Sequence, residues 1–131
     1  MIRTEKTLVV DVDGTLCPIK PADMAYGDLP AEPAMKARLA QLRADGWYIV
    51  LFSSRGMRTY GGDVVAILDH VLPPMVEWLD RNGIAYDEVQ LAKPWPGHDG
   101  FYIDDRAVRP REFLTLSLEE LADVCAADRV A

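Results

Sequence analysis

The sequence predicts an α/β fold in which a central parallel sheet is flanked by helices on both faces. Two observations lead to this prediction. Short apolar runs alternate with longer segments whose apolar residues recur at helical spacing, and residues that favour turns separate them. The chain has 131 residues, half of them hydrophobic. This length and composition predict one domain, residues 1–131, and exclude a disordered or collagen-like chain.

The first two expected strands are residues 8–10 and 47–52, because both are runs of apolar and aromatic residues typical of buried parallel strands. A loop rich in proline, glycine and aspartate, residues 17–30, follows the first strand. A helix is expected to begin near Pro33, since proline suits the first helical turn. It is expected to end near Gly46, since glycine is a common helix terminator.

In the second half, apolar residues recur at helical spacing over residues 63–82. Pro73 and Pro74 are expected to break or restart this helix, because proline lacks the amide donor and clashes with the preceding turn. Residues 88–91 and 100–103 are two further expected strands. A capping box at 117–120 indicates a last helix, which ends near residue 127.

The net charge limits the classes of partner. With 14 basic and 21 acidic residues, the net charge is −7, which disfavours a general binder of nucleic acid or anionic membranes but not of a small phosphorylated metabolite. Cys17 and Cys125 indicate neither a disulfide framework nor a zinc site. The sequence shows no signal-peptide core and no apolar run near the ~18 residues of a membrane span, so a cytoplasmic protein is expected. The oligomeric state is left open, with a dimer as one option.

Polar side chains follow each expected strand. Because the carboxyl ends of parallel strands meet at one edge of a sheet, where ligands bind, these side chains should lie together. They are Asp11 and Asp13 after the first strand, Ser53, Ser54 and Arg55 after the second, Lys93 after the third, and Asp104 and Asp105 after the fourth. A divalent cation would relieve the repulsion between the carboxylates, and oxygen ligands favour Mg²⁺ over zinc. Carboxylates, a metal and a lysine are what phosphoryl transfer requires.

The segment DVDGT, residues 11–15, is the most specific of these signals. Asp11 could attack phosphorus while Asp13 handles protons, and Gly14 permits the tight turn between them. One alternative is a calcium loop of the EF-hand type. That loop needs glycine at its sixth position in a helical context, whereas here the glycine is fourth and a strand precedes it. The other alternative, a loop of aspartates without chemistry, is disfavoured by the remaining strand ends.

Four segments, DVDGT, LFSSR, AKP and YIDDR, resemble in order and placement the four motifs of the haloacid dehalogenase (HAD) superfamily. The resemblance extends over nearly the whole chain. TLCP, SSRGMRTYGGD, VEWLDRNGIAYDE and KPWPGHDGFYIDDRAVRPREF resemble, more narrowly, the small phosphatases of bacterial capsular-polysaccharide biosynthesis. The resemblance implies a Rossmann-like, three-layer fold. The intervals after the first and second motifs are too short for a cap domain.

The resemblance also implies a Mg²⁺-dependent phosphomonoester hydrolase acting on a small phosphorylated sugar or polyol. Asp11 would be the nucleophile that forms an aspartyl-phosphate, and Asp13 would protonate the leaving oxygen and then activate water. Asp11, the backbone carbonyl of Asp13 and Asp104 would hold Mg²⁺. Asp105 would orient metal-bound water, although which member of this adjacent pair binds the metal directly is left open.

Phosphate binding is assigned to Ser53, with Ser54 as its competitor until the strand register decides, and to Lys93, which would neutralise developing charge. The candidate contacts to the rest of the substrate are Arg55, Arg58, Tyr60 and His98. For the two arginines, binding of a second anionic group and a solvated loop charge are equally weighted readings. His98 could instead brace its loop.

Two other functions fit parts of the pattern. Polynucleotide 3′-phosphatases have similar DxDGT and DDR segments, but the net charge of −7 and the absence of a basic stripe count against nucleic acid. A non-catalytic interaction subunit with a HAD fold should have lost a motif residue, and the sequence retains all of them.

Overall fold

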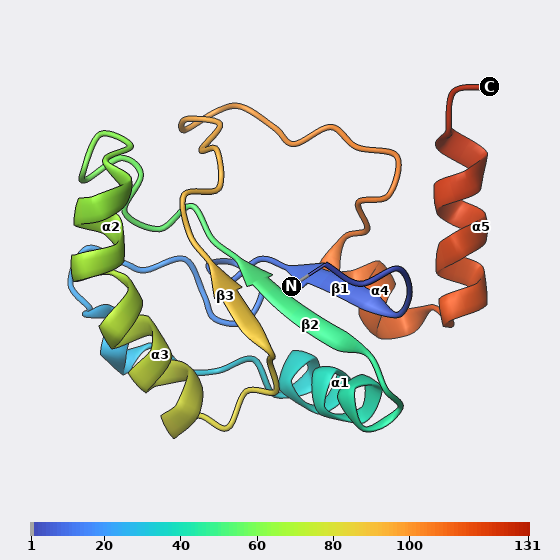
Figure 1. The fold of residues 1–131 in the computed structure, drawn as a ribbon, viewed down its shortest axis with the longest axis horizontal. Coiled ribbons are helices and arrows are strands. Elements are labelled where there is room, and N and C mark those ends of the chain that lie inside the picture. Colours follow the sequence, from blue (N-terminus) through green and yellow to red (C-terminus); the bar gives the residue numbers. More distant parts are fainter. Residues whose placement is uncertain (1) are drawn as a thin grey trace. The chain divides into compact units, whose positions relative to one another are not determined.

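The computed structural model describes residues 2–131. The chain divides into two units, Met1–Trp95 and Pro96–Ala131, and each is described by itself (Figure 1). The first unit contains the sheet. The second contains helices α4, Pro110–Thr115, and α5, Leu118–Asp128. The single domain that the sequence predicts stays a prediction.

The sheet consists of three parallel strands in the order β1-β2-β3. They are β1 (Thr7–Val10), β2 (Tyr48–Phe52) and β3 (Glu88–Gln90), each within one residue of an expected strand at both ends. Helices connect the strands, as parallel pairing requires. The predicted fold class, a Rossmann-like α/β fold with a parallel sheet, is therefore confirmed.

The middle strand lies in the core. Its register places Val50 beside Val9 of β1 and beside Glu88 of β3. Ile49, Val50 and Leu51 are all buried. Because successive strand residues point to opposite faces, both faces of β2 are covered. In β1, by contrast, the Val9 side chain is 66% exposed.

The helices of the first unit begin and end where the sequence indicates. They are α1 (Pro33–Ala44), α2 (Val64–His70) and α3 (Leu72–Arg81). Proline occupies the first turn of α1, and Gly46 just beyond its end has φ +95°, a conformation that costs glycine little. The two prolines at 73 and 74 lie in the first turn of α3, so the long apolar stretch forms two helices rather than one.

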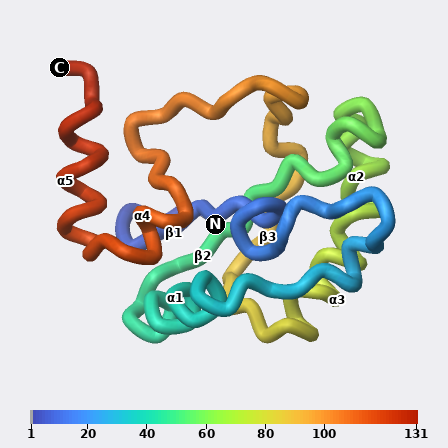
Figure 2. The backbone as a smooth tube through the Cα atoms, turned by 180° about the vertical axis from the view of Figure 1, so that it is seen from behind, coloured from blue at the N-terminus to red at the C-terminus, as the bar shows by residue number. Residues whose placement is uncertain are grey.

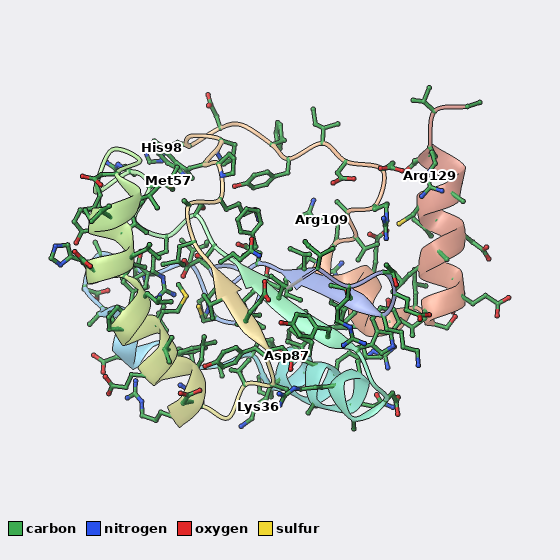
Figure 3. The ribbon with its side chains drawn as sticks, viewed as in Figure 1. Lys36, Met57, Asp87, His98, Arg109 and Arg129 are labelled. Atoms are coloured by element: carbon green, nitrogen blue, oxygen red, sulfur yellow. The ribbon has the colours of Figure 1, made fainter. Side chains whose placement is uncertain are left out.

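One hydrogen-bonded carboxylate ties α1 to the sheet. Asp87, labelled in Figure 3 just before β3, accepts hydrogen bonds from Arg43 of α1 at 2.9 Å and from the backbone N–H of Ile49 at 2.8 Å. Because the same carboxylate binds both groups, it fixes the end of α1 against β2.

Two expectations in the second unit need correction. Residues 100–103, expected as a fourth strand, form no strand, and their backbone is irregular. Residues 101–103 are apolar, but a strand also needs a hydrogen-bonded partner, which a local pattern does not supply. Helix α4 was not expected, although Pro110 at its start and Glu112, which accepts from the Arg109 N–H at 2.9 Å, are standard helix-start signals. The capping box at 117–120 is confirmed at the start of α5.

The segments between the strands contain no inserted domain among the described residues. Between β1 and α1 lies only the short 3₁₀ turn η1, Tyr26–Asp28, and between β2 and β3 lie only α2 and α3. The absence of a cap in these segments agrees with the sequence prediction. Across residues 2–131, no helix has the length and apolar character needed to cross a membrane.

The segment between β1 and α1 is fastened to α3, along which it passes in Figure 2. The indole N–H of Trp78 donates to the backbone carbonyl of Leu29 at 2.9 Å, and both residues are buried. Arg81 donates to the carbonyl of Gly27, also at 2.9 Å. These two bonds hold η1 in place although the segment has little regular structure.

We expect Trp78→Phe to lower the free energy of unfolding by roughly 2–4 kcal/mol, because it leaves the buried Leu29 carbonyl without its donor and creates a cavity. Urea unfolding of the variant measures this change. Tyr86→Phe is the control, since it removes only an exposed hydroxyl that bonds Asp80 at 2.9 Å. It should change the free energy by less than about 0.5 kcal/mol. Equal stability of the two variants would contradict the role of the indole bond.

Candidate active site

A tight turn after β1 carries the first two candidate residues. The N–H of Leu16 donates to the carbonyl of Val12 at 2.8 Å, and the N–H of Gly14 donates to the carbonyl of Cys17 at 2.8 Å. Gly14 has φ +86°, where a side chain would be strained. The turn leaves Asp11 and Asp13 half-buried at the carboxyl end of β1.

The ends of β2 and β3 are joined by hydrogen bonds that extend beyond the strands. The N–H of Ser53 donates to the carbonyl of Gln90 at 3.0 Å, and the N–H of Lys93 donates to the carbonyl of Ser53 at 3.2 Å. Between these points Ala92 has φ +61°, in the left-handed region that a non-glycine residue seldom adopts. The backbone thus places Lys93 beside Ser53, whose side chain is buried while Ser54 is half-buried.

Lys93 reaches across to Asp11. Its Nζ lies 3.5 Å from Asp11 Oδ1, with 17% of the lysine side chain and 35% of the aspartate side chain exposed. Burial raises the pKa of Asp11 above its ordinary value, the ammonium of Lys93 opposes that rise, and the nearby charge of Asp13 adds to it. A further positive charge at this carboxylate would therefore favour its ionised form.

Arg55 pairs with Asp13 through two hydrogen bonds. Its Nη2 donates to Oδ1 at 2.8 Å and its Nε donates to Oδ2 at 3.1 Å. The backbone N–H of Arg55 also donates to the hydroxyl of Ser53 at 3.1 Å. The Tyr26 ring lies 4.0 Å from the guanidinium carbon. The sequence left Arg55 open between a substrate contact and a solvated loop charge and did not single out Tyr26, because neither contact is local in sequence.

The donors near Asp11 and Asp13 suit a hard cation. They are carboxylate and carbonyl oxygens together with the Cys17 thiol, whose Sγ lies 3.7 Å from Asp13 Oδ1. Burial, followed by the charge of Asp13, raises the pKa of the Cys17 thiol to about 11. No group of three or more histidine, cysteine or acidic side chains that could hold a metal occurs among residues 2–131. The predicted magnesium site stays a prediction.

We expect Cys125 to react with a thiol reagent in the folded protein near pH 8 and Cys17 to react only after denaturation. Cys17 is 3% exposed and its pKa is raised to about 11, whereas Cys125 is half-buried. Mass spectrometry of the labelled peptides, with and without urea, measures both rates. Equal labelling of Cys17 in the native and denatured protein would contradict this expectation.

The other candidate residues lie in loops. Arg58 is exposed, and the Tyr60 ring stacks on His70 with centroids 5.3 Å apart. Gly56, with φ +87°, starts this loop, and a side chain there would approach Val71 to 2.7 Å. His98 is exposed in the second unit.

The acidic pair of the second unit makes contacts within that unit. Asp104 accepts a hydrogen bond from the N–H of Arg106 at 2.9 Å. Asp105 binds Arg129, labelled beyond α5 in Figure 3, at 2.6 Å. The hydrogen bond from Arg129 lowers the pKa of Asp105. The prediction that this pair joins Asp11 and Asp13 at a metal stays a prediction.

Neither a protein-family model nor a curated protein matches the chain. A solved structure, an MCSG target protein from Vibrio cholerae, is 43% identical, with 95% of this chain and 100% of that chain covered and a TM-score of 0.89. The D,D-heptose 1.7-bisphosphate phosphatase from B. bronchiseptica, complexed with magnesium and phosphate, is 23% identical, with 74% of this chain and 54% of that chain covered and a TM-score of 0.48. Because the 43% identity extends over nearly the whole length of both chains, this protein belongs to the same family as the Vibrio cholerae protein.

Proposed function

We propose that the protein is a Mg²⁺-dependent phosphomonoester hydrolase of the HAD type that works through an aspartyl-phosphate. The observation that supports this most is the pairing of Lys93 with Asp11 at 3.5 Å beside a second aspartate and a buried serine, all at the carboxyl ends of parallel strands. A nucleophile, a proton carrier, a hydroxyl donor and a cation are the groups that phosphoryl transfer uses.

In the first step, a carboxylate oxygen of Asp11 attacks phosphorus and forms a bond to it while the bond from phosphorus to the leaving oxygen breaks. Asp13, as the protonated acid, donates its proton to that leaving oxygen. The hydroxyl of Ser53 and the ammonium of Lys93 hydrogen-bond the phosphoryl oxygens, where negative charge accumulates. The alcohol leaves and Asp11 is phosphorylated.

In the second step, Asp13 is a carboxylate and takes a proton from water as the water oxygen attacks phosphorus. The bond from Asp11 to phosphorus breaks, and inorganic phosphate is released. Asp11 is again a carboxylate and Asp13 is again the protonated acid. Lys93 again neutralises the phosphoryl oxygens. One residue therefore acts as acid and then as base.

Asp11, the backbone carbonyl of Asp13 and Asp104 would hold Mg²⁺, with Asp105 orienting a bound water. The ion would supply positive charge to the phosphoryl oxygens and to the nucleophile. The carboxylate and carbonyl oxygens of this donor set suit Mg²⁺ better than zinc.

The substrate class follows from the resemblance of the loop and motif segments to phosphatases of capsular-polysaccharide biosynthesis. We propose a small phosphorylated sugar or polyol used in making a surface polysaccharide. Without an inserted cap, short loops have to recognise the leaving group and exclude water. The segment 55–63, with Arg58 and Tyr60, is our candidate for this task.

A phosphate-release screen over phosphorylated metabolites tests the proposal. The panel contains sugar phosphates, polyol phosphates, phosphorylated acids and a 3′-phosphorylated oligonucleotide, each with Mg²⁺ and with chelator. We expect release from one or more sugar or polyol phosphates that depends on Mg²⁺. Preference for the oligonucleotide would favour the polynucleotide 3′-phosphatase instead, and no release from any compound would contradict a phosphatase.

We expect Arg58→Ala or Tyr60→Ala to reduce kcat/KM on the preferred sugar phosphate by about tenfold or more, and on 4-nitrophenyl phosphate by much less. The aryl phosphate has a good leaving group and needs little help from the loop. The ratio of kcat/KM for the two substrates measures this selectivity. Equal losses on both would indicate that the loop supports the fold, and specificity would then lie elsewhere, for instance near Trp95 and His98.

A further inference from the structure

We propose that Arg55 is a positioning residue that fixes the carboxylate of Asp13 for proton transfer. We propose further that Tyr26 holds Arg55 in this position, so that the segment between β1 and α1 helps to orient Asp13. This inference rests on the proposed function, because it assigns a role within the same reaction. It concerns only contacts inside the first unit.

The pairing of Arg55 with Asp13 restricts the orientation of the carboxylate. Both carboxylate oxygens are engaged, at 2.8 and 3.1 Å, by two nitrogens of one planar group. Such a two-bond contact fixes the plane of the carboxylate, whereas a single bond leaves it free to rotate. The side chains are mostly buried, with 7% of Arg55 and 22% of Asp13 exposed, so water competes weakly for these bonds.

Arg55 is itself held on two sides. Its N–H is bonded to the hydroxyl of the buried Ser53 at 3.1 Å, which sets where the side chain leaves the backbone. The guanidinium lies over the ring of Tyr26 at 4.0 Å, within the range of an attractive cation–π contact. With its Nε and Nη2 directed at Asp13 and one face covered by Tyr26, Arg55 is better placed to orient the acid than to bind substrate.

Tyr26 is a fixed support. It begins η1, whose neighbouring carbonyls at Gly27 and Leu29 accept bonds from Arg81 and Trp78 of α3 at 2.9 Å. The Nζ of Lys20 lies 5.4 Å from the centre of the same ring. A chain of contacts thus runs from α3 through η1 and Tyr26 to Arg55 and the proton carrier.

Because kcat/KM reports only the steps up to formation of the phosphoryl-enzyme, a misplaced Asp13 should lower kcat/KM only where the leaving oxygen needs its proton. Slower hydrolysis of the phosphoryl-enzyme, in which Asp13 takes the proton from water, would appear in kcat and not in kcat/KM. The P–O bond of an alkyl phosphate breaks to a strongly basic alkoxide unless the acid donates to it, whereas 4-nitrophenolate leaves without help. The reduction of kcat/KM caused by a misoriented Asp13 should therefore increase with the basicity of the leaving group. A lost fold or a lost phosphate contact would slow every substrate alike.

The experiment uses Arg55→Lys, which keeps the charge but cannot make the planar two-bond contact, and Tyr26→Leu, at a position 38% exposed. The matched controls are Arg43→Lys, at a similar two-bond pair with Asp87 away from the site, and Tyr86→Leu. For each protein, kcat and KM are measured with Mg²⁺ on ethyl, phenyl and 4-nitrophenyl phosphate. Thermal unfolding shows whether each variant is folded.

We expect Arg55→Lys to lose on the order of a hundredfold in kcat/KM on ethyl phosphate and less than about threefold in kcat/KM on 4-nitrophenyl phosphate. Tyr26→Leu should lose about tenfold in kcat/KM on ethyl phosphate and less than about threefold on 4-nitrophenyl phosphate. The plot of log kcat/KM against leaving-group pKa becomes steeper in both variants and stays unchanged in both controls. Because Tyr26 is partly exposed, its variant tests the inference even if Arg55→Lys does not fold.

Equal losses of kcat/KM on all three phosphates would overturn the inference and leave the proposed function standing. A raised KM with unchanged kcat would overturn it as well, because Arg55 would then bind substrate. If the wild-type protein released phosphate from none of the three compounds or the metabolite panel, the proposed function would fail, and the inference with it.

Discussion

Asp11→Asn is expected to reduce turnover by at least about a thousandfold, because an amide cannot attack phosphorus. Asp13→Asn should cause a loss of similar size, because an amide cannot carry the proton between leaving oxygen and water. Both changes keep the size and shape of the side chain, so the fold should be retained. Steady-state phosphate release on the best substrate from the screen measures the loss.

The two variants should differ in the step of the reaction that they block. Asp11→Asn cannot form the phosphoryl-enzyme at all, whereas Asp13→Asn can form it from an aryl phosphate and then hydrolyses it slowly. Rapid quenching with acid and mass spectrometry of residues 7–16 would detect the adduct in one variant alone. Glu5→Gln, at an exposed position outside the site, is the control. Near-normal activity of Asp11→Asn would rule out the covalent mechanism.

Removal of Mg²⁺ with excess chelator is expected to abolish measurable turnover. Burial raises the pKa of Asp11, and the second aspartate beside it adds to that rise, so a bound cation would favour the ionised nucleophile. Restoring Mg²⁺ should restore the rate, which excludes damage by the chelator. Phosphate release during titration with each metal measures this dependence.

Calcium should be a poor substitute for magnesium in the same assay. It takes more ligands at longer distances and would loosen the in-line arrangement of nucleophile and leaving group. Asp104→Asn tests the predicted ligand, since it should raise the Mg²⁺ concentration needed for half-maximal rate by about tenfold or more. Full activity in excess chelator would contradict the proposed chemistry.

The helices of the first unit and α5 were predictable from the sequence because their ends are set by local chemistry, whereas α4 was not expected. Pro33, Gly46 and Ser117 each mark a helix boundary through a property of their own backbone or side chain, and the structure places boundaries there. The break between α2 and α3 follows likewise from two prolines. Residues 100–103 show the limit of this reasoning, since whether an apolar run joins a sheet depends on a partner far away in sequence.

The candidate site was predictable in part, because its residues directly follow the predicted strands. The parallel-sheet rule brings Asp11, Ser53 and Lys93 to neighbouring strand ends, and the structure places them there. It does not tell which partner each charged side chain selects. Arg55 lies 42 positions from Asp13, and the aromatic ring above it belongs to η1, in the segment between β1 and α1. Both contacts are long-range and became visible only in three dimensions.

The hydrogen bonds that continue beyond β2 and β3 through Ser53 tie the backbone of Lys93 to the end of the sheet. Amides in such a ladder exchange with solvent only when the sheet itself opens, so the amides of Ser53 and Lys93 should be among the slowest-exchanging of the chain. Under the proposed function, replacements in the loops could then alter which alcohol is released while the groups proposed to bind the phosphoryl oxygens stay in place. In laboratory evolution, substitutions that admit new substrates would be introduced first in the loops, and the residues at the strand ends would be kept unchanged.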